Sequence, residues 1–259
     1  MPMAEMPSIP GFECVRFLGI NLGTVFLARE SATGTLVALK VYRPEFASHF
    51  REIDGALKDL NHPNIVRILA SGESERYNFL ALEFIEGTLA DRLLRGPLTQ
   101  AEVVRLSLAI ASALEYARSH GVESHNLTPS GILLSEAGIP KLMDFHPVGG
   151  DAGMAVPSGF MAPEELEGHV TAATDVYRIG AVMYAMLTGA SPFGSETTAL
   201  ETLRRSWEQT PVSPRQLNPQ VSGPLQTICL KCLEMRADAR YATPRELVEA
   251  LRPLGANPS

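Results

Sequence analysis

The hydrophobic pattern of this chain changes its period once, near Glu86, and that change limits what the chain can fold into. Three short apolar or alternating segments, FECVRFLG, TVFLARE and TLVALKVY, lie within residues 12–42, separated by turn-prone INLG and SATG. This pattern predicts an antiparallel meander of strands. After Gly87 the apolar residues recur at spacings of three and four, as in AEVVRLSLAIASALEYARSHG, which predicts helices. The sequence therefore predicts an α+β chain with two lobes, the first β-rich and the second helical.

Smaller elements follow from the same pattern. Residues 46–60 have apolar positions at helical spacing and predict a helix, whereas residues 65–73 and 77–86 predict two further strands. Two short tails are expected to flank the lobes. The predicted boundaries of the first tail, the β-rich lobe, the helical lobe and the second tail are 1–11, 12–86, 87–254 and 255–259.

Charge and composition argue against several classes of protein. The 259 residues carry a net charge of −7, so no global basic field favours a nucleic acid or an anionic membrane as a partner. The first residues, MPMAEMPSIPGF, lack the basic and apolar regions of a signal peptide. No apolar run reaches the roughly 20 residues of a membrane helix. Three cysteines are too few for a disulfide framework, so a reducing cytoplasm is the expected location.

Two of the cysteines, Cys229 and Cys232, form a C-x-x-C sequence within TICLKCLE. One interpretation is a redox or metal-binding pair. The other is the apolar face of a helix, because Ile228, Cys229, Cys232 and Leu233 are spaced by one, three and four residues. No second cysteine pair or nearby histidine pair completes a zinc site, and free cysteine is usually buried. The helix face is the favoured interpretation.

Eight short segments occur in a fixed order along the chain. They are VALK at 37–40, LNHPNIVRIL at 60–69, LALEFIEG at 80–87, HGVESHNLTPSGILL at 120–134, PKLMDF at 140–145, MAPEEL at 161–166, TDVYRIGAVMYAMLTGASPF at 174–193 and RADARYATPREL at 236–247. Together they resemble the motifs of the eukaryotic-type protein kinase family, in the style of bacterial serine/threonine kinases, over nearly the whole chain. The resemblance implies a bilobal protein-kinase-like fold and an ATP-dependent phosphotransferase ancestry.

The catalytic-loop segment departs from the family at its functional positions. The family style H-R-D-L-K-P-S-N becomes SHNLTPSG at 124–131. Asn126 stands at the position of the catalytic Asp, and an amide is a poor proton acceptor. Thr128 replaces a Lys that neutralises the transferring phosphate, and Gly131 replaces the Asn that holds a second metal ion. Phosphoryl transfer is therefore expected to be lost or strongly impaired, unless a nearby acid such as Glu123 acts as the base.

The activation segment lacks the parts of a phosphorylation switch. His125 replaces the Arg that pairs with an activation-segment phosphate in many family members. Residues 146–160, HPVGGDAGMAVPSGF, contain no Thr or Tyr and only one hydroxyl side chain, Ser158. His146 also replaces the glycine of D-F-G, which restricts the backbone there. Control by phosphorylation of this segment is not expected.

The resemblance implies a nucleotide pocket that is only partly intact. Lys40 matches the residue that reaches the α- and β-phosphates, and Asp144 matches the ligand of one Mg²⁺ ion. The residues expected around adenine are Val25, Ala38, Leu133, Leu82 at the gatekeeper position, and the backbone near Glu83 and Ile85. The glycine loop keeps Gly19 and Gly23, but it is shorter and has Asn21 near its middle glycine. ATP binding is therefore left open, and Mg²⁺ binding is expected to be weak or absent.

The partner of Lys40 is ambiguous. The expected Glu, about nine residues before His62, is replaced by Ile53, and Glu52 lies one residue too early. A bulge or break at Gly55 could restore a Glu52–Lys40 pair. Otherwise Lys40 is expected to pair with Asp144.

Several scaffold residues match the family. Glu164 and Arg240 match a buried ion pair that anchors the activation segment. Asp175 matches an Asp that receives backbone N–H groups of the catalytic loop, and Phe145 matches the Phe of D-F-G.

Scaffold residues are retained while chemical residues are lost, and this favours a pseudokinase. Such a protein is expected to act as a signalling scaffold or regulator through protein partners, for example an active kinase. A weak or unconventional serine/threonine kinase that orients its substrate with Asn126 is the first alternative. The second is a nucleotide-sensing switch built on Lys40 and Asp144.

Overall fold

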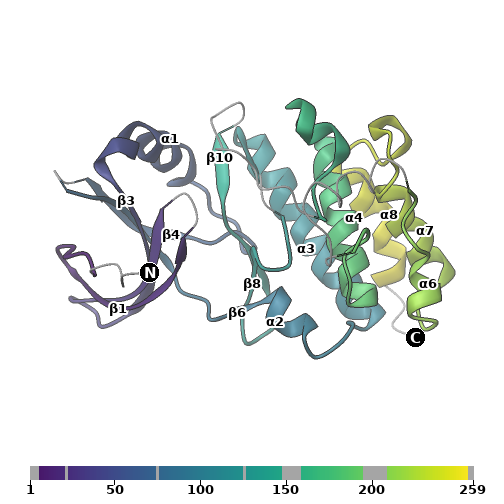
Figure 1. Ribbon diagram of the computed structural model, residues 1–259, viewed down its shortest axis with the longest axis horizontal. Helices are drawn as coiled ribbons and strands as arrows, with labels where there is room; N and C mark the ends of the chain where they lie inside the picture. The colour runs from purple at the N-terminus through teal and green to yellow at the C-terminus, as the bar shows by residue number, and fades with distance from the viewer. Residues whose placement is uncertain are drawn as a thin grey trace.

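A five-stranded antiparallel sheet forms the amino-terminal lobe, in the order β1-β2-β3-β5-β4. The computed structural model describes residues 6–20, 23–73, 76–124, 127–147, 159–194 and 209–255. Sequence-adjacent strands form the meander that the alternating segments predict. The strands are β1 (Phe12–Ile20), β2 (Thr24–Glu30), β3 (Leu36–Tyr42), β4 (Ile68–Glu73) and β5 (Asn78–Glu83). Figure 1 shows this lobe at the opposite end of the molecule from the carboxyl-terminal helices.

One helix, α1 (Ala47–Leu57), packs on the sheet after a short 3₁₀ turn, η1 (Pro44–Phe46). Its apolar side turns inward, so Phe50 and Ile53 are buried in a cluster with Tyr42 and Leu80. The helix runs through Gly55 without interruption. The suggested bulge or break at Gly55 is therefore wrong, and this outcome decides which side chain faces the sheet.

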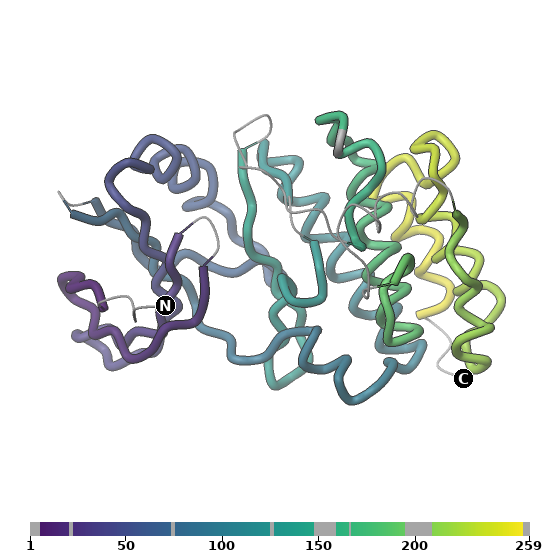
Figure 2. The backbone as a smooth tube through the Cα atoms, in the orientation of Figure 1, coloured from purple at the N-terminus to yellow at the C-terminus, as the bar shows by residue number. Residues whose placement is uncertain are grey.

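The second lobe is helical, as the change of period predicts. Its longest helices are α3 (Gln100–Ser119) and α4 (Ala172–Thr188), and α4 is buried along almost its whole length. The other helices and turns of the described part of this lobe are α2 (Leu89–Leu93), η2 (Pro163–Glu167), α6 (Pro214–Leu217), α7 (Gly223–Cys232), η3 (Ala237–Ala239) and α8 (Pro244–Gly255). The chain thus has the bilobal α+β architecture expected from the sequence. Figure 2 follows it from the purple sheet lobe, through teal strands, to the yellow helices.

Two small sheets lie between the main sheet and the helices. One has the order β6-β8-β9, and the other pairs β10 with β7. Their strands are β6 (Gly87–Thr88), β7 (Val122–Ser124), β8 (Ile132–Leu134), β9 (Pro140–Leu142) and β10 (Phe145–Pro147). Backbone hydrogen bonds from Val66 to Leu142 and from Leu142 to Asn64, both 2.8 Å, join the segment before β4 to β9. These sheets bring the ends of β3, β5 and β9 to one place.

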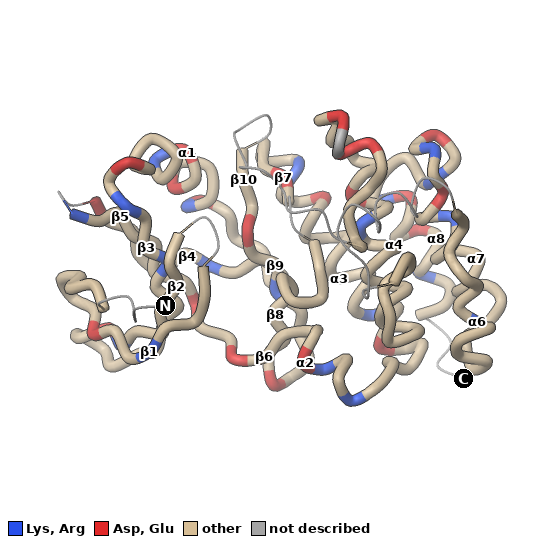
Figure 3. Tube along the Cα trace, viewed as in Figure 1, with Lys and Arg blue, Asp and Glu red and all other residues tan. Residues whose placement is uncertain are grey.

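Charged residues of both signs are interspersed along the trace of both lobes (Figure 3). Within the described residues, no helix is long and apolar enough to cross a membrane.

The C-x-x-C sequence lies in the core, on the buried face of α7. Both thiols are inaccessible to solvent, and burial raises the pKa of each. The Cys229 thiol faces the carbonyl oxygen of Gly180 in α4 at 3.7 Å. No group of three metal-ligating side chains occurs among the residues that the structure describes. The interpretation as the apolar face of a helix fits this arrangement.

The crossing of α4 and α7 depends on Gly180. A Cβ atom there would lie 2.4 Å from the Cβ atom of Cys232. Gly180→Ala is therefore expected to lower the free energy of unfolding by about 1–3 kcal/mol, because overpacking forces the helices apart. Gly55→Ala is the matched control, since no heavy atom lies within 4 Å of its added Cβ. The control is expected to raise helix stability by roughly 0.5–1 kcal/mol. Urea unfolding measures both, and a Gly180→Ala protein as stable as wild type would contradict the prediction.

Candidate functional site: a lysine–aspartate pair between the lobes

A buried ion pair connects the main sheet to the short segment between β9 and β10. Lys40 lies on β3, which is flanked by β2 and β5, and Asp144 lies between β9 and β10. The Lys40 Nζ and Asp144 Oδ1 atoms are 3.3 Å apart, and each side chain is only 7% exposed. Asp144 has a left-handed backbone conformation, with φ of 63°, where Asp is tolerated better than most residues. The pair therefore sits where the two lobes meet.

The electrostatics of the pair favour its charged form. Burial alone would lower the pKa of Lys40, but the Asp144 carboxylate and Tyr42 outweigh burial, so the pKa of Lys40 lies above its ordinary value. A raised lysine pKa adds stability below the ordinary pKa, and this contribution is lost as the pH rises through the raised pKa. At neutral pH the lysine is therefore held as a cation against Asp144.

Glu52 does not take part in this pair. It is exposed to solvent, whereas Ile53 is buried on the inner side of α1. Because α1 is regular through Gly55, the residue that faces the sheet is the isoleucine. Of the two arrangements that the sequence leaves open, the structure has Lys40 against Asp144, and the Glu52–Lys40 pair is not formed.

An apolar cavity of about 40 Å³ lies behind the ion pair. Lys40, Asp144 and Ile53 contribute to its wall, together with Leu82 and Phe145. Phe145 is 3% exposed and pairs with Ser124 across β10 and β7. The cavity is too small for a nucleotide. It lies between α1, the main sheet and the residues that join β9 to β10.

The residues predicted to surround adenine come from both lobes. Val25 is opposite Lys40, and Ala38 is opposite Leu82, in neighbouring strand pairs. Because side chains two residues apart lie on the same side of a strand, these four share one face of the main sheet. Leu133 lies on β8 in the other lobe, and all of them except Lys40 are half-buried.

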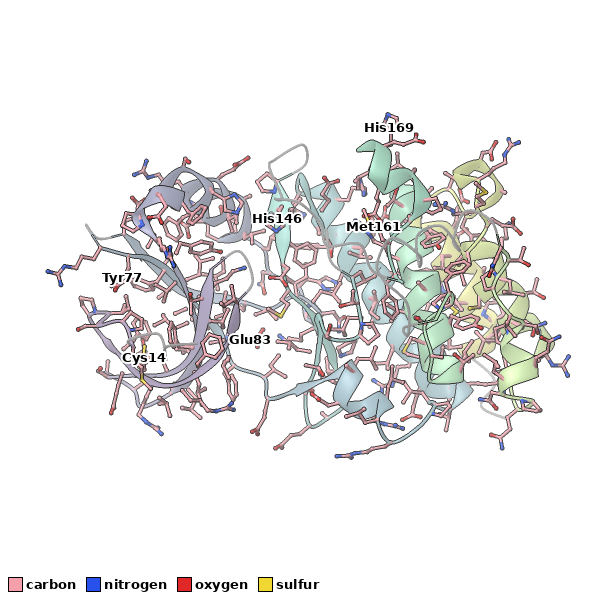
Figure 4. The ribbon with its side chains drawn as sticks, viewed as in Figure 1. Cys14, Tyr77, Glu83, His146, Met161 and His169 are labelled. Atoms are coloured by element: carbon pink, nitrogen blue, oxygen red, sulfur yellow. The ribbon has the colours of Figure 1, made fainter. Side chains whose placement is uncertain are left out.

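The segment between the lobes is held through the side chain of Glu83. The Lys141 Nζ atom lies 2.6 Å from Glu83 Oε1, and the backbone N–H of Arg67 donates to the same oxygen at 2.8 Å. Figure 4 shows Glu83 at the junction of the lobes. Ile85 is half-buried two residues later, between β5 and β6. The Glu83 carboxylate thus joins the end of β5 to the start of β4, through Arg67, and to β9, through Lys141.

The glycine loop is described only at its two ends. Gly19 pairs with Val25 at the end of β1, and a side chain there would meet no other atom within 4 Å. At Gly23 an added Cβ would lie 3.0 Å from the carbonyl oxygen of Val41, so the close approach to β3 favours glycine. Asn21, which the sequence places near the middle glycine of the loop, lies outside the described residues.

The catalytic-loop segment is described on both sides of residues 125 and 126. Asn126 and His125 lie outside the described residues. The hydroxyl of Thr128 accepts a hydrogen bond from the backbone N–H of Gly131 at 3.2 Å and lies 3.0 Å from the Ser130 hydroxyl. Thr128 therefore supports the turn of its own loop and supplies no positive charge.

Glu123, the candidate substitute base, is turned into the helical lobe. Its side chain is buried, and its nearest guanidinium is that of Arg118, at 3.9 Å. On the other strand of this small sheet, His146 is opposite Glu123 and stacks on His49 of α1, with ring centroids 5.8 Å apart. Figure 4 shows His146 on β10, next to α1. The glycine-to-histidine change thus connects β10 to α1.

The anchor between Glu164 and Arg240 has the geometry that the resemblance implies. The guanidinium donates to both carboxylate oxygens, at 2.7 and 2.9 Å, and Thr174 donates to Glu164 at 2.9 Å. Burial raises the pKa of Glu164, but the hydrogen bonds and charge of Arg240, together with hydrogen bonds from the backbone and from Thr174, outweigh burial and lower it. The carboxyl group is therefore ionised at neutral pH.

The buried carboxylate of Asp175 is bonded by an arginine side chain. The Arg118 side chain donates to its Oδ2 atom at 2.7 and 3.1 Å. Within the described residues, no backbone N–H of the catalytic loop donates to this carboxylate. The expected contacts with residues 125 and 126 lie outside the described residues, and the partner that the structure describes is a guanidinium on α3.

One buried cation was missed by the sequence analysis. Arg178 lies in the middle of α4 and is 1% exposed, with Glu165 as its ion-pair partner. A charged residue within the apolar run DVYRIGAVMYAM was the available signal. A charge at such a position must be paired, because an unpaired buried ion is strongly unfavourable.

A sheet lobe and a helical lobe, with a lysine of the third strand paired to an aspartate between them, define a protein kinase fold. The chain belongs to the protein kinase family. Residues 12–250 match the family model for the protein kinase domain.

Curated relatives of this chain are bacterial serine/threonine kinases. It is 26% identical over 264 residues to the probable serine/threonine-protein kinase CPE1738 of Clostridium perfringens, covering 95% of this chain and 38% of that protein. It is 32% identical over 264 residues to the DNA damage-responsive serine/threonine-protein kinase RqkA of Deinococcus radiodurans, and this match covers 91% of this chain and 39% of that protein. It is 29% identical over 260 residues to serine/threonine-protein kinase PknB of Mycolicibacterium smegmatis, and this match covers 91% of this chain and 41% of that protein. The chain spans about two fifths of the length of these relatives.

Proposed function

We propose that this chain is a pseudokinase, a kinase-family domain in which phosphoryl transfer is lost or strongly impaired. The observation that carries the proposal is the joint change of the catalytic loop to Asn126, Thr128 and Gly131. Kinase catalysis is mostly positioning and electrostatic stabilisation, and each preorganised group contributes about 10²–10³ in rate. Losses within one catalytic unit are not additive, so the expected impairment is large but smaller than their product.

The lysine–aspartate pair supports the same proposal. Lys40 and Asp144 are the groups that would meet phosphates and a metal ion, and here they bind each other at 3.3 Å. A nucleotide must separate them, and Glu52 is not placed to hold the freed lysine. Weak ATP binding with little help from Mg²⁺ is therefore part of the proposal.

The domain is proposed to act by binding proteins, such as an active kinase or another signalling protein, in a reducing cytoplasm. The retained Glu164–Arg240 anchor keeps the helical lobe ordered without serving chemistry. A nucleotide-sensing switch is the second candidate, and the Lys40–Asp144 pair favours it. Any ligand that separates these two charges changes the contact between β3 and the strand after β9.

A phosphotransfer assay combined with a nucleotide titration tests these proposals. Wild-type protein is expected to incorporate no more phosphate into a general acceptor protein, or into itself, than Lys40→Met, while an active serine/threonine kinase labels the acceptor. In thermal unfolding, millimolar ATP is expected to raise Tm slightly and equally with and without Mg²⁺.

Each outcome bears on one proposal. Phosphate incorporation that depends on Lys40 would overturn the pseudokinase assignment. An unchanged Tm at millimolar ATP would remove the nucleotide-sensing candidate and leave protein binding. Circular dichroism of Lys40→Met verifies that the control is folded, because the substitution leaves Asp144 without its lysine.

A further inference from the structure

Arg178 contacts two segments that are far apart in the sequence. Its Nε atom donates to Glu165 Oε1 at 2.9 Å, and its Nη2 atom donates to Glu165 Oε2. Its Nη1 atom donates to the backbone carbonyl of Ser124. Glu165 belongs to η2, which follows the activation segment, whereas Ser124 is the last residue of β7 before the catalytic loop. One guanidinium therefore joins the ends of both segments.

The contact is buried and directional. The side chains of Arg178 and Glu165 are 1% and 5% exposed. The planar guanidinium presents its donors in a fixed fork, which suits a carboxylate on one edge and a carbonyl on the next. Glu165 Oε1 also accepts from the backbone N–H of Ala162 at 2.8 Å. The position of the η2 turn is thus tied, through Glu165, to the position of Arg178 on α4.

The surrounding charges do not compete equally for Arg178. Asp175 Oδ1 is 3.7 Å from its Nη1 atom, beyond hydrogen-bond distance, and Asp175 is engaged by Arg118 through its other oxygen. The Glu123 carboxylate lies 3.9 Å from Arg118, beyond hydrogen-bond distance, and it adds only a longer-range attraction to Arg178. Arg178 is therefore committed to Glu165 and Ser124.

We propose that Arg178 is a positioning residue that fastens the end of the activation segment to the start of the catalytic loop without a phosphate group. A buried guanidinium on a rigid helix performs here what a phosphate and an exposed arginine could do only after modification. His125 and the lack of Thr and Tyr in residues 146–160 leave no phosphate-dependent connection of that kind. The two segments are then held in one arrangement at all times, whether or not the domain transfers phosphate.

Paired substitutions separate this positioning role from a purely structural one. Breaking a buried pair destabilises a protein, but replacing both partners by apolar residues is often neutral. Arg178→Met/Glu165→Met is therefore expected to be less destabilised in urea unfolding than either single methionine variant. The Ser124 carbonyl and the Ala162 N–H nevertheless lose their partners in this variant. Hydrogen exchange in peptides covering 122–132 and 159–167 is expected to accelerate at least tenfold.

The control is a core truncation away from the network. Leu251→Ala in α8 removes a fully buried side chain and is expected to destabilise the whole domain. Its exchange should rise throughout the protein, without the local excess at 122–132 and 159–167. Arg178→Lys keeps the charge but not the fork, so it is expected to show the local acceleration in part.

The independence from phosphate has its own control. Ser158→Ala, and wild-type protein treated with a phosphatase, are expected to keep the slow exchange of untreated wild type in both peptides. Wild-type exchange rates in the double methionine variant would overturn the positioning role. Acceleration after phosphatase treatment would overturn the claim that no phosphate is needed. If the double variant does not fold, Arg178→Lys against Leu251→Ala decides the same question.

Discussion

Arg240→Met is expected to lower the free energy of unfolding by about 3–5 kcal/mol, the usual cost of removing one partner of a buried ion pair. The Arg240 side chain is completely buried and has more than one role. Besides Glu164, its guanidinium donates to the backbone carbonyls of Glu234, Met235 and Ala173, and it lies 4.8 Å from the ring centroid of Tyr177. Methionine fills part of the volume and satisfies none of these acceptors.

The control for this prediction lies one turn away. Arg236 forms an ion pair with Asp238, but both side chains are exposed to solvent. Arg236→Met is expected to leave the urea midpoint unchanged, because exposed pairs are screened by water. Equal effects of the two substitutions would contradict the assignment of Arg240 as the anchor.

Acid unfolding gives a second measure of the same anchor. The folded-state pKa of Glu164 is lowered, so the pair adds stability above the ordinary carboxyl pKa. That contribution is lost as the pH falls through the lowered pKa. Arg240→Met removes the cause of the shift, and its stability is expected to fall less steeply than that of wild type over the same acid range.

Patterns within a few residues of each other predicted most of the fold. The alternation in residues 12–42 gave the strands of the meander, and helical spacing gave α3, α4 and the burial of Cys229 and Cys232. These features depend on local periodicity, which a sequence displays directly. The scaffold pair Glu164–Arg240 was predictable because both residues lie in recognisable segments.

Features that depend on rotation or on distant contacts were not predictable. Whether Glu52 or Ile53 faces Lys40 depends on the phase of α1, and a single inserted residue changes that phase by about 100°. Arg118 of α3 meets Asp175 of α4 only after the two helices pack together. Nothing in the spacing of Arg118 and Asp175 along the chain indicates that they share one buried network.

Restoring the catalytic loop is the substitution with the largest expected effect on activity. Asn126→Asp, Thr128→Lys and Gly131→Asn together are expected to raise phosphate incorporation at least about 10²-fold above wild type, because they return a base, a cation and a metal ligand. Transfer of radiolabelled phosphate from ATP to a general acceptor measures the gain. Lys40→Met in the same triple background is expected to abolish it. No gain in the folded triple variant would show that the loop is not what limits transfer.

The triple variant is still expected to be slower than an active kinase, since Lys40 remains held by Asp144. Ile53 lines the same small cavity as both of these residues, so Ile53→Glu would place a second carboxylate beside the lysine. Lys40 could then pair with Glu at position 53 and leave Asp144 for a metal ion. Adding Ile53→Glu to the triple variant is therefore expected to raise the rate further and to make ATP binding depend on Mg²⁺. If ATP binding by the variant with Ile53→Glu does not depend on Mg²⁺, the Lys40–Asp144 pair is not what limits metal binding and phosphate transfer.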